Sequence, residues 1–99
     1  MTATETMHLL ALDEHWRPLG RLDGGGEWRD IVSHLLHLDS QWLVIEQRRA
    51  DDPFPTPRWG DIHLSRTLSR RLRPMEMKLA DHVIHAGQRR FSFREAGLL

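Results

Sequence analysis

The sequence contains no cysteine, no long apolar run and no excess of charge of either sign. Without cysteine the chain cannot form disulfides, thiolate zinc sites or a cysteine nucleophile, and both reducing and oxidising compartments suit it. The longest apolar runs, LLAL and WLVI, are too short to span a bilayer or to form the core of a signal peptide. We therefore expect a cytoplasmic protein that does not associate with a membrane.

The net charge is zero, because 14 basic residues balance 14 acidic ones. A domain dedicated to nucleic acid usually carries a net positive field, so this balance argues against that class. The charges are nevertheless segregated, with seven acidic residues in residues 1–40 and seven arginines in residues 48–73. Such segregation favours self-association or an acidic partner, although an ordinary solvated surface explains it as well.

The 99 residues suit a single domain, which we assign to residues 1–99. Alternating and continuous apolar runs predict strands at residues 7–12, 17–22, 41–46, 78–86 and 90–93. The run at 41–46 is typical of a central strand that is buried on both faces. The first and last pairs of strands each surround a short polar turn, which predicts two hairpins.

Apolar residues at helical spacing predict two helices. The first begins near Glu27 and the second near Asp61, whose side chain is well placed to cap it, until Pro74 discourages continuation. Together, these strands and helices predict an α/β (α+β) fold, with two helices packed on a mainly antiparallel sheet of about five strands.

Residues 60–99 resemble the end of RadC-type proteins, the bacterial branch of the JAB/MPN (JAMM) metalloprotease-like fold. The shared marks are the Asp-Ile-x-Leu that begins at Asp61, the pair Asp81-His82 twenty residues later, and a Ser-Phe followed by Gly-Leu-Leu. Glu5 and the apolar strand after it match more weakly. The resemblance implies a JAB/MPN-like fold.

The same resemblance implies zinc held by two histidines and an aspartate, in a His-x-His-Pro motif that leads to Ser-x-x-Asp. A glutamate near the first strand acts as base on the metal-bound water. A gapless count back from Asp61 puts the histidine positions on Arg48 and Ala50 and the serine on Arg58, so only Asp61 and Glu5 match. Alanine has no lone pair and arginine is a permanent cation. We therefore predict a vestigial site with no metal and no cofactor; zinc is expected only in an intact family site.

Ordinary structural roles are the alternative explanation of several of these residues. Asp61 can be a helix N-cap, and Glu5 an exposed residue at the end of a strand. Arg48 and Arg58 are either loop charges or the cations that neutralise Glu5 and Asp61 in the old pocket. We expect His82 to make a structural hydrogen bond beside Asp81.

Substitute metal ligands are the alternative reading of the histidines. A zinc hydrolase with a non-standard site would use Glu5 and Asp61 with a recruited histidine such as His63. His34 and His37 lie three residues apart on the polar face of the first helix, but no third ligand is near them in sequence.

The arginines of the second helix and the preceding loop form a candidate phosphate-binding surface made of Arg48, Arg58, Arg66 and Arg70, and Trp59 could stack on an unpaired base. A nucleic-acid-binding module related to DNA repair is therefore a further alternative. The segment after Gly26 is shorter than the family pattern, which exposes a sheet edge to a protein partner or a second copy of the chain. Our interpretation is a metal-free pseudoenzyme that acts as a binding or scaffolding module.

Overall fold

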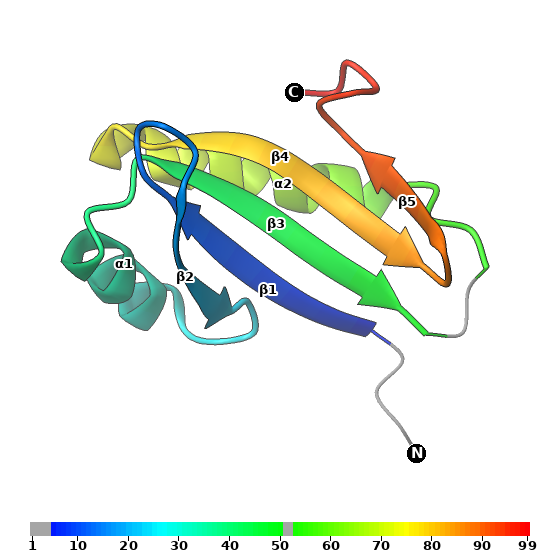
Figure 1. Cartoon of the computed structure of the whole chain (residues 1–99), viewed down its shortest axis with the longest axis horizontal. Helices are drawn as coiled ribbons and strands as arrows, with labels where there is room; N and C mark the ends of the chain where they lie inside the picture. The colour runs from blue at the N-terminus through cyan, green and yellow to red at the C-terminus, as the bar shows by residue number, and fades with distance from the viewer. Residues whose placement is uncertain (1–4, 51–52) are drawn as a thin grey trace.

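A five-stranded sheet with the strand order β2-β1-β3-β4-β5 forms the centre of the computed structural model, which describes residues 5–50 and 53–99 (Figure 1). The strands are β1 (Glu5–Leu12), β2 (Pro18–Asp23), β3 (Trp42–Arg49), β4 (Lys78–Ala86) and β5 (Arg89–Ser92). The helices are α1 (Trp28–His37) and α2 (Trp59–Leu72), and a single 3₁₀ turn, η1 (Arg73–Met75), follows α2.

Three of the four neighbouring strand pairs are antiparallel, as predicted, but β3 and β4 run parallel. A parallel pair needs a long crossover, and α2 supplies it between the two strands. The predicted α+β fold, with five strands and two helices, is confirmed, and the sheet is mixed. The central place predicted for residues 41–46 is also confirmed, since β3 is the middle strand.

Strand β3 differs from the prediction in its length and its burial. It continues to Arg49 instead of ending at residue 46, because it pairs with β1 on one side and β4 on the other along its whole length. Alternate residues from Leu43 to Arg49 are buried, and those between them are half-buried or exposed. One face of β3 therefore packs against the helices, and the other face is only partly covered.

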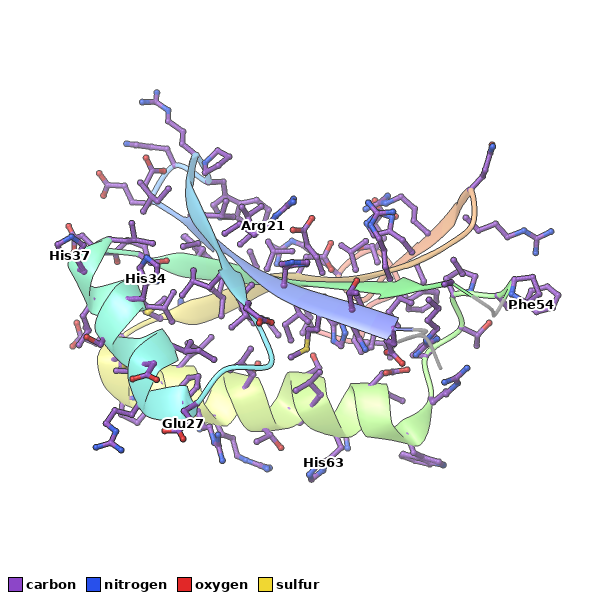
Figure 2. All side chains as sticks on the ribbon, turned by 90° about the horizontal axis from the view of Figure 1, so that it is seen from below. Arg21, Glu27, His34, His37, Phe54 and His63 are labelled. Carbon is purple, nitrogen blue, oxygen red and sulfur yellow. The ribbon has the colours of Figure 1, made fainter. Side chains whose placement is uncertain are left out.

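Both helices cover the same face of the sheet (Figure 2). The side chains that pack between the helices and the sheet form one core: Leu9, Ala11, Leu22, Ile31, Leu35, Leu43, Ile45, Leu68, Leu72, Met77 and Leu79. Helices α1 and α2 supply two of these side chains each, and most of the others come from the strands. Burial of this apolar area is the main term that stabilises the fold.

The start of α2 differs from the prediction by three residues, because Arg58 and not Asp61 is the N-cap. The helix begins at Trp59, Arg58 is its N-cap residue, and Asp61 lies at the third helical position. Asp61 still stabilises the start of the helix, because its carboxylate accepts a hydrogen bond from the Arg58 backbone N–H, which has no partner within the helix. None of the helices in the described part of the chain has the length and apolar character needed to cross a membrane.

Candidate functional site

Four polar side chains meet at the end of β3, between β1 and the first turn of α2. Gln47 and Arg49 are buried on the helix side of the sheet, while Arg48 between them is exposed, as the alternation of a strand requires. Glu5 lies opposite Arg49 in the antiparallel ladder of β1 and β3. Asp61 reaches the same point from α2. These residues form the candidate site.

Asp61 is the centre of the hydrogen bonding. Its carboxylate accepts the Arg58 backbone N–H at 2.8 Å and Nε2 of Gln47 at 3.2 Å, and it forms an ion pair with Nη2 of Arg49. Burial by itself raises the pKa of Asp61. The hydrogen bonds from Arg58, Arg49 and Gln47, with the positive charge of Arg49, outweigh burial and hold the pKa below its usual value. Asp61 is therefore an anion at neutral pH.

Arg49 is buried, with only 3% of its surface exposed. Besides the ion pair with Asp61, its Nη1 donates to the backbone oxygen of Thr56 at 3.0 Å. Its Nε lies 3.9 Å from Oε1 of Glu5. The guanidinium thus lies between the two carboxylates, and it ties the end of β3 to the loop before α2.

Gln47 links the carboxylates to β4. Its Nε2 donates to Oε1 of Glu5 at 2.7 Å and to Oδ1 of Asp61, and its Oε1 is hydrogen-bonded to Nε2 of His82. An amide oxygen can only accept, so the proton of His82 lies on Nε2. Nδ1 of His82 is then an unprotonated nitrogen, and it is buried without a hydrogen-bond partner among residues 5–50 and 53–99.

His82 is fully buried, and its ring stacks on Phe93 with the ring centroids 4.1 Å apart. Burial lowers the pKa of His82 to about 4, and the opposing effect of the nearby Asp61 and Asp81 carboxylates is smaller. The imidazole is therefore neutral at pH 7. The structural hydrogen bond expected of His82 is present, and its partner is Gln47.

A family model for the RadC-like JAB domain matches residues 26–98, which is well over half of the chain. The chain belongs to the RadC-like JAB domain family. No curated protein matches it. The matched range contains every side chain of the site except Glu5, which β1 contributes.

The side chains of this RadC-like JAB domain do not fit the zinc that the family resemblance implies. Zinc is bound by thiolate, imidazole and carboxylate groups, whereas the groups around Asp61 are an amide and a guanidinium. Arg49 has no lone pair to donate, and its charge repels a divalent ion. Within residues 5–50 and 53–99, no group of three or more His, Cys, Asp or Glu side chains is arranged to hold a metal.

The two positions that the gapless count assigned to the family histidines, Arg48 and Ala50, lie outside the hydrogen-bonded network around Asp61. Arg48 is exposed and is paired in the sheet with Thr6 and His85, and Ala50 is exposed beyond the end of β3. The side chains that contact Asp61 are Gln47 and Arg49, each one residue earlier in the chain. We therefore propose that Gln47 and Arg49 occupy the histidine positions of the RadC-like domain, and that the loop before α2 holds one additional residue.

The other predicted site residues are spread along α2. Arg58 contributes its backbone N–H to the site, and Trp59 is 81% exposed at the helix start. Arg66 and Arg70 are exposed further along the helix, away from Asp61. His63 points away from the sheet (Figure 2), with its Nε2 3.4 Å from Oγ1 of Thr67.

Sequence reasoning missed Gln47 and Arg49 as members of the site. The signal that could have found them is the strand alternation, because Leu43 and Ile45 are the apolar residues of the same face. Extending that alternation by two steps places Gln47 and Arg49 beside Asp61.

Proposed function

We propose that this RadC-like JAB domain is a metal-free member of its family, and that it acts as a binding or scaffolding module and not as a hydrolase. The observation that carries the proposal is the ion pair between Arg49 and Asp61, which places a buried guanidinium between the two carboxylates of the site. The guanidinium supplies within the chain the positive charge that a metal ion supplies in an intact family site.

Zinc binding would have to disrupt this arrangement. Asp61 would lose its ion pair, and Arg49 would be left as a buried cation with a weakened set of partners. Breaking a buried pair by removing one partner costs roughly 3–5 kcal/mol, which a site with a single carboxylate ligand does not recover. Glu5 accepts a hydrogen bond from Gln47, so its carboxylate belongs to the same network.

A domain that keeps the fold of its family without the metal ligands can still act by binding other molecules. Support for a protein partner, or a second copy of the chain, comes from the large apolar side chains that are more than half exposed, including Trp59 at the start of α2 and Leu36 on α1. Aromatic side chains such as Trp59 are frequent anchors of protein interfaces.

Elemental analysis of protein purified without a histidine tag tests the proposal. We expect well under one zinc per chain, because Gln47 and Arg49 cannot replace two histidines as ligands. A zinc content near one per chain that persists through gel filtration would contradict the proposal.

A further inference from the structure

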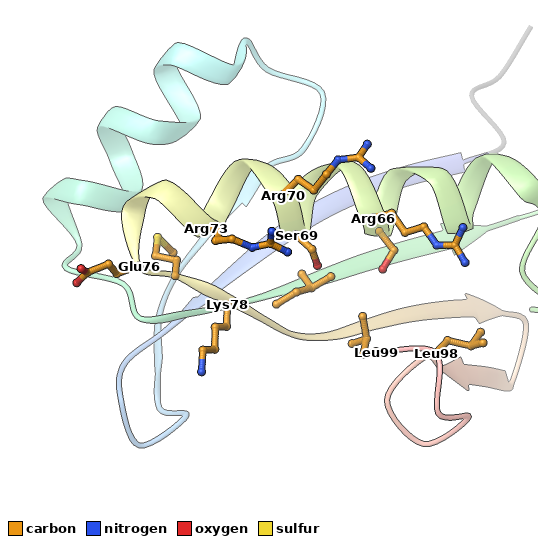
Figure 3. A pocket seen from close by; sticks show the side chains of 11 residues that line it. Arg66, Ser69, Arg70, Arg73, Glu76, Lys78, Leu98 and Leu99 are labelled. Carbon is orange, nitrogen blue, oxygen red and sulfur yellow. The ribbon is translucent and has the colours of Figure 1, made fainter.

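A groove of about 820 Å³ lies between α2 and the last residues of the chain (Figure 3). Its apolar side chains are Met77 and Leu79, which are buried, and Leu98 and Leu99, which are half-exposed. Its polar side chains come mainly from α2 and the turn after it: Ser65, Arg66, Ser69, Arg70, Arg73, Glu76 and Lys78. The groove is separate from the site around Asp61.

The four basic side chains of the groove, Arg66, Arg70, Arg73 and Lys78, have no carboxylate partner among the described residues. Glu76 is the single acidic side chain among the residues that line the groove. Clustered cations beside an apolar surface attract a ligand that is both anionic and partly apolar.

The groove also follows an open edge of the sheet. Strand β5 pairs only with Val83–Ala86, so the preceding residues of β4, 78–81, have no strand beside them on that side among the described residues. Part of this edge is engaged, because the carboxylate of Asp81 accepts hydrogen bonds from Oγ of Ser92 at 2.6 Å and from the backbone N–H of Arg94 at 3.0 Å. Nη1 of Arg94 also donates to the backbone oxygen of Ala80 at 3.3 Å. An open edge is a common docking place for an extended peptide.

We propose that this groove binds an extended acidic peptide segment of a protein partner. In an extended segment alternate side chains point in opposite directions. Acidic side chains on one side can reach Arg66 of α2 and Arg73 of the turn after it, while apolar ones on the other contact Leu98 and Leu99. This inference gives a partner class to the binding role proposed above and rests on that role.

Single-stranded nucleic acid is the competing ligand, since it too is anionic. Its non-specific sites combine cations with aromatic side chains on which the bases stack. Among the described residues that line this groove there is no aromatic side chain, and its apolar surface comes from leucine and methionine. The observations therefore favour the peptide.

Fluorescence anisotropy with the full chain tests the inference. The probe is a labelled peptide of about ten residues in which glutamate alternates with leucine, and the comparison ligands are a lysine-leucine peptide and a single-stranded oligonucleotide of equal length. We expect the acidic peptide to bind, with an affinity that falls as salt rises, and to bind at least tenfold more tightly than either comparison ligand.

Charge reversal locates the binding. We expect Arg66→Glu with Arg73→Glu to weaken peptide binding about tenfold or more, because two attractions become repulsions. Arg29→Glu, an exposed reversal on α1, should leave binding unchanged. Circular dichroism checks that both variants fold. Absence of peptide binding, equal loss in the Arg29→Glu control, or tighter binding of the oligonucleotide overturns the inference. Zinc content of the same preparations is an independent result, so a failure here is distinguishable from a failure of the metal-free proposal.

Discussion

At the scale of single residues, the side chain that decides the character of the site is Arg49. Its guanidinium forms an ion pair with Asp61 and donates a hydrogen bond to the backbone oxygen of Thr56. It also lies 3.9 Å from the carboxylate of Glu5. A histidine at the same position could offer a lone pair to a metal, whereas arginine can only donate hydrogen bonds. An arginine at this position therefore places an internal cation where a histidine could act as a metal ligand.

Replacing Arg49 by methionine tests the importance of that cation. We expect Arg49→Met to lower the free energy of unfolding by roughly 3–5 kcal/mol at pH 7, because Asp61 loses its buried partner. Urea denaturation measures the change. Arg48→Met is the matched control, since Arg48 is exposed on the other face, and it should change the stability by less than about 0.5 kcal/mol. Equal effects of the two substitutions would show that the ion pair is unimportant.

His82 predicts a specific dependence of stability on pH. Its pKa is about 4 in the folded protein and 6.5 in its ordinary state, so the unfolded chain takes up the proton first as the pH falls. Stability is therefore complete above pH 6.5 and decreases as the pH falls toward 4, by roughly 3 kcal/mol for this residue.

Denaturation curves between pH 7.5 and 4 check this dependence. His82→Gln keeps a donor for Gln47 but cannot titrate, so it should flatten the curve over that range, even though it lowers stability at pH 7. His37→Gln, on the exposed face of α1, should keep the slope of the parent protein. A parent curve that is flat from pH 6.5 to 4 would refute the buried neutral histidine.

At the scale of secondary-structure elements, periodicity located all five strands and both helices. It gave both ends of β4 correctly, but it misplaced at least one end of each other strand. β3 was predicted to stop at residue 46 because Gln47, Arg48 and Arg49 are polar, and polar residues usually mark the end of a buried strand. They stay in the strand because the ladders with β1 and β4 continue, and because Asp61, Glu5 and His82 satisfy the buried side chains. Those partners are distant in sequence, so no local pattern contains them.

The register of β3 leads to a prediction about restoring the metal site. With Gln47→His and Arg49→His together, two imidazoles would face Asp61 and complete three protein ligands, so we expect measurable zinc binding by titration calorimetry. Adding Asp61→Ala to this double variant should strongly weaken zinc binding, because the third protein ligand is then removed.

The matched control places histidines at the positions given by the gapless count. Arg48→His with Ala50→His should bind no more zinc than the parent protein, since Arg48 points to the other face of the sheet and Ala50 lies beyond its end. If this control pair binds zinc through Asp61 and the first pair does not, the gapless assignment is right and the proposed shift by one residue is wrong.

At the scale of the whole molecule, the resemblance of residues 60–99 and the periodic apolar pattern were sufficient to predict the family and the α+β class. The parallel pairing of β3 and β4 did not follow from periodicity, because periodicity locates strands and helices and does not show which strands become neighbours. The two strands are parallel because α2 returns the chain to the starting end of the sheet before β4 begins. The groove beside α2 was also invisible in sequence, since it needs Arg66, Lys78 and Leu98 to come together from three separate segments. The sequence showed that the arginines of α2 form a charged face. It did not show that this face borders a groove beside the edge of the sheet.

The central claim is that an internal ion pair, and not a metal, holds this site together. The most direct test is the free energy of unfolding of tag-free protein, measured by urea denaturation in excess chelator and again in excess zinc. A resident metal that binds only the folded state would stabilise the protein by about 4 kcal/mol at a thousandfold excess over its dissociation constant. We predict the same free energy of unfolding in both conditions. A loss of stability in chelator that zinc restores would contradict the claim.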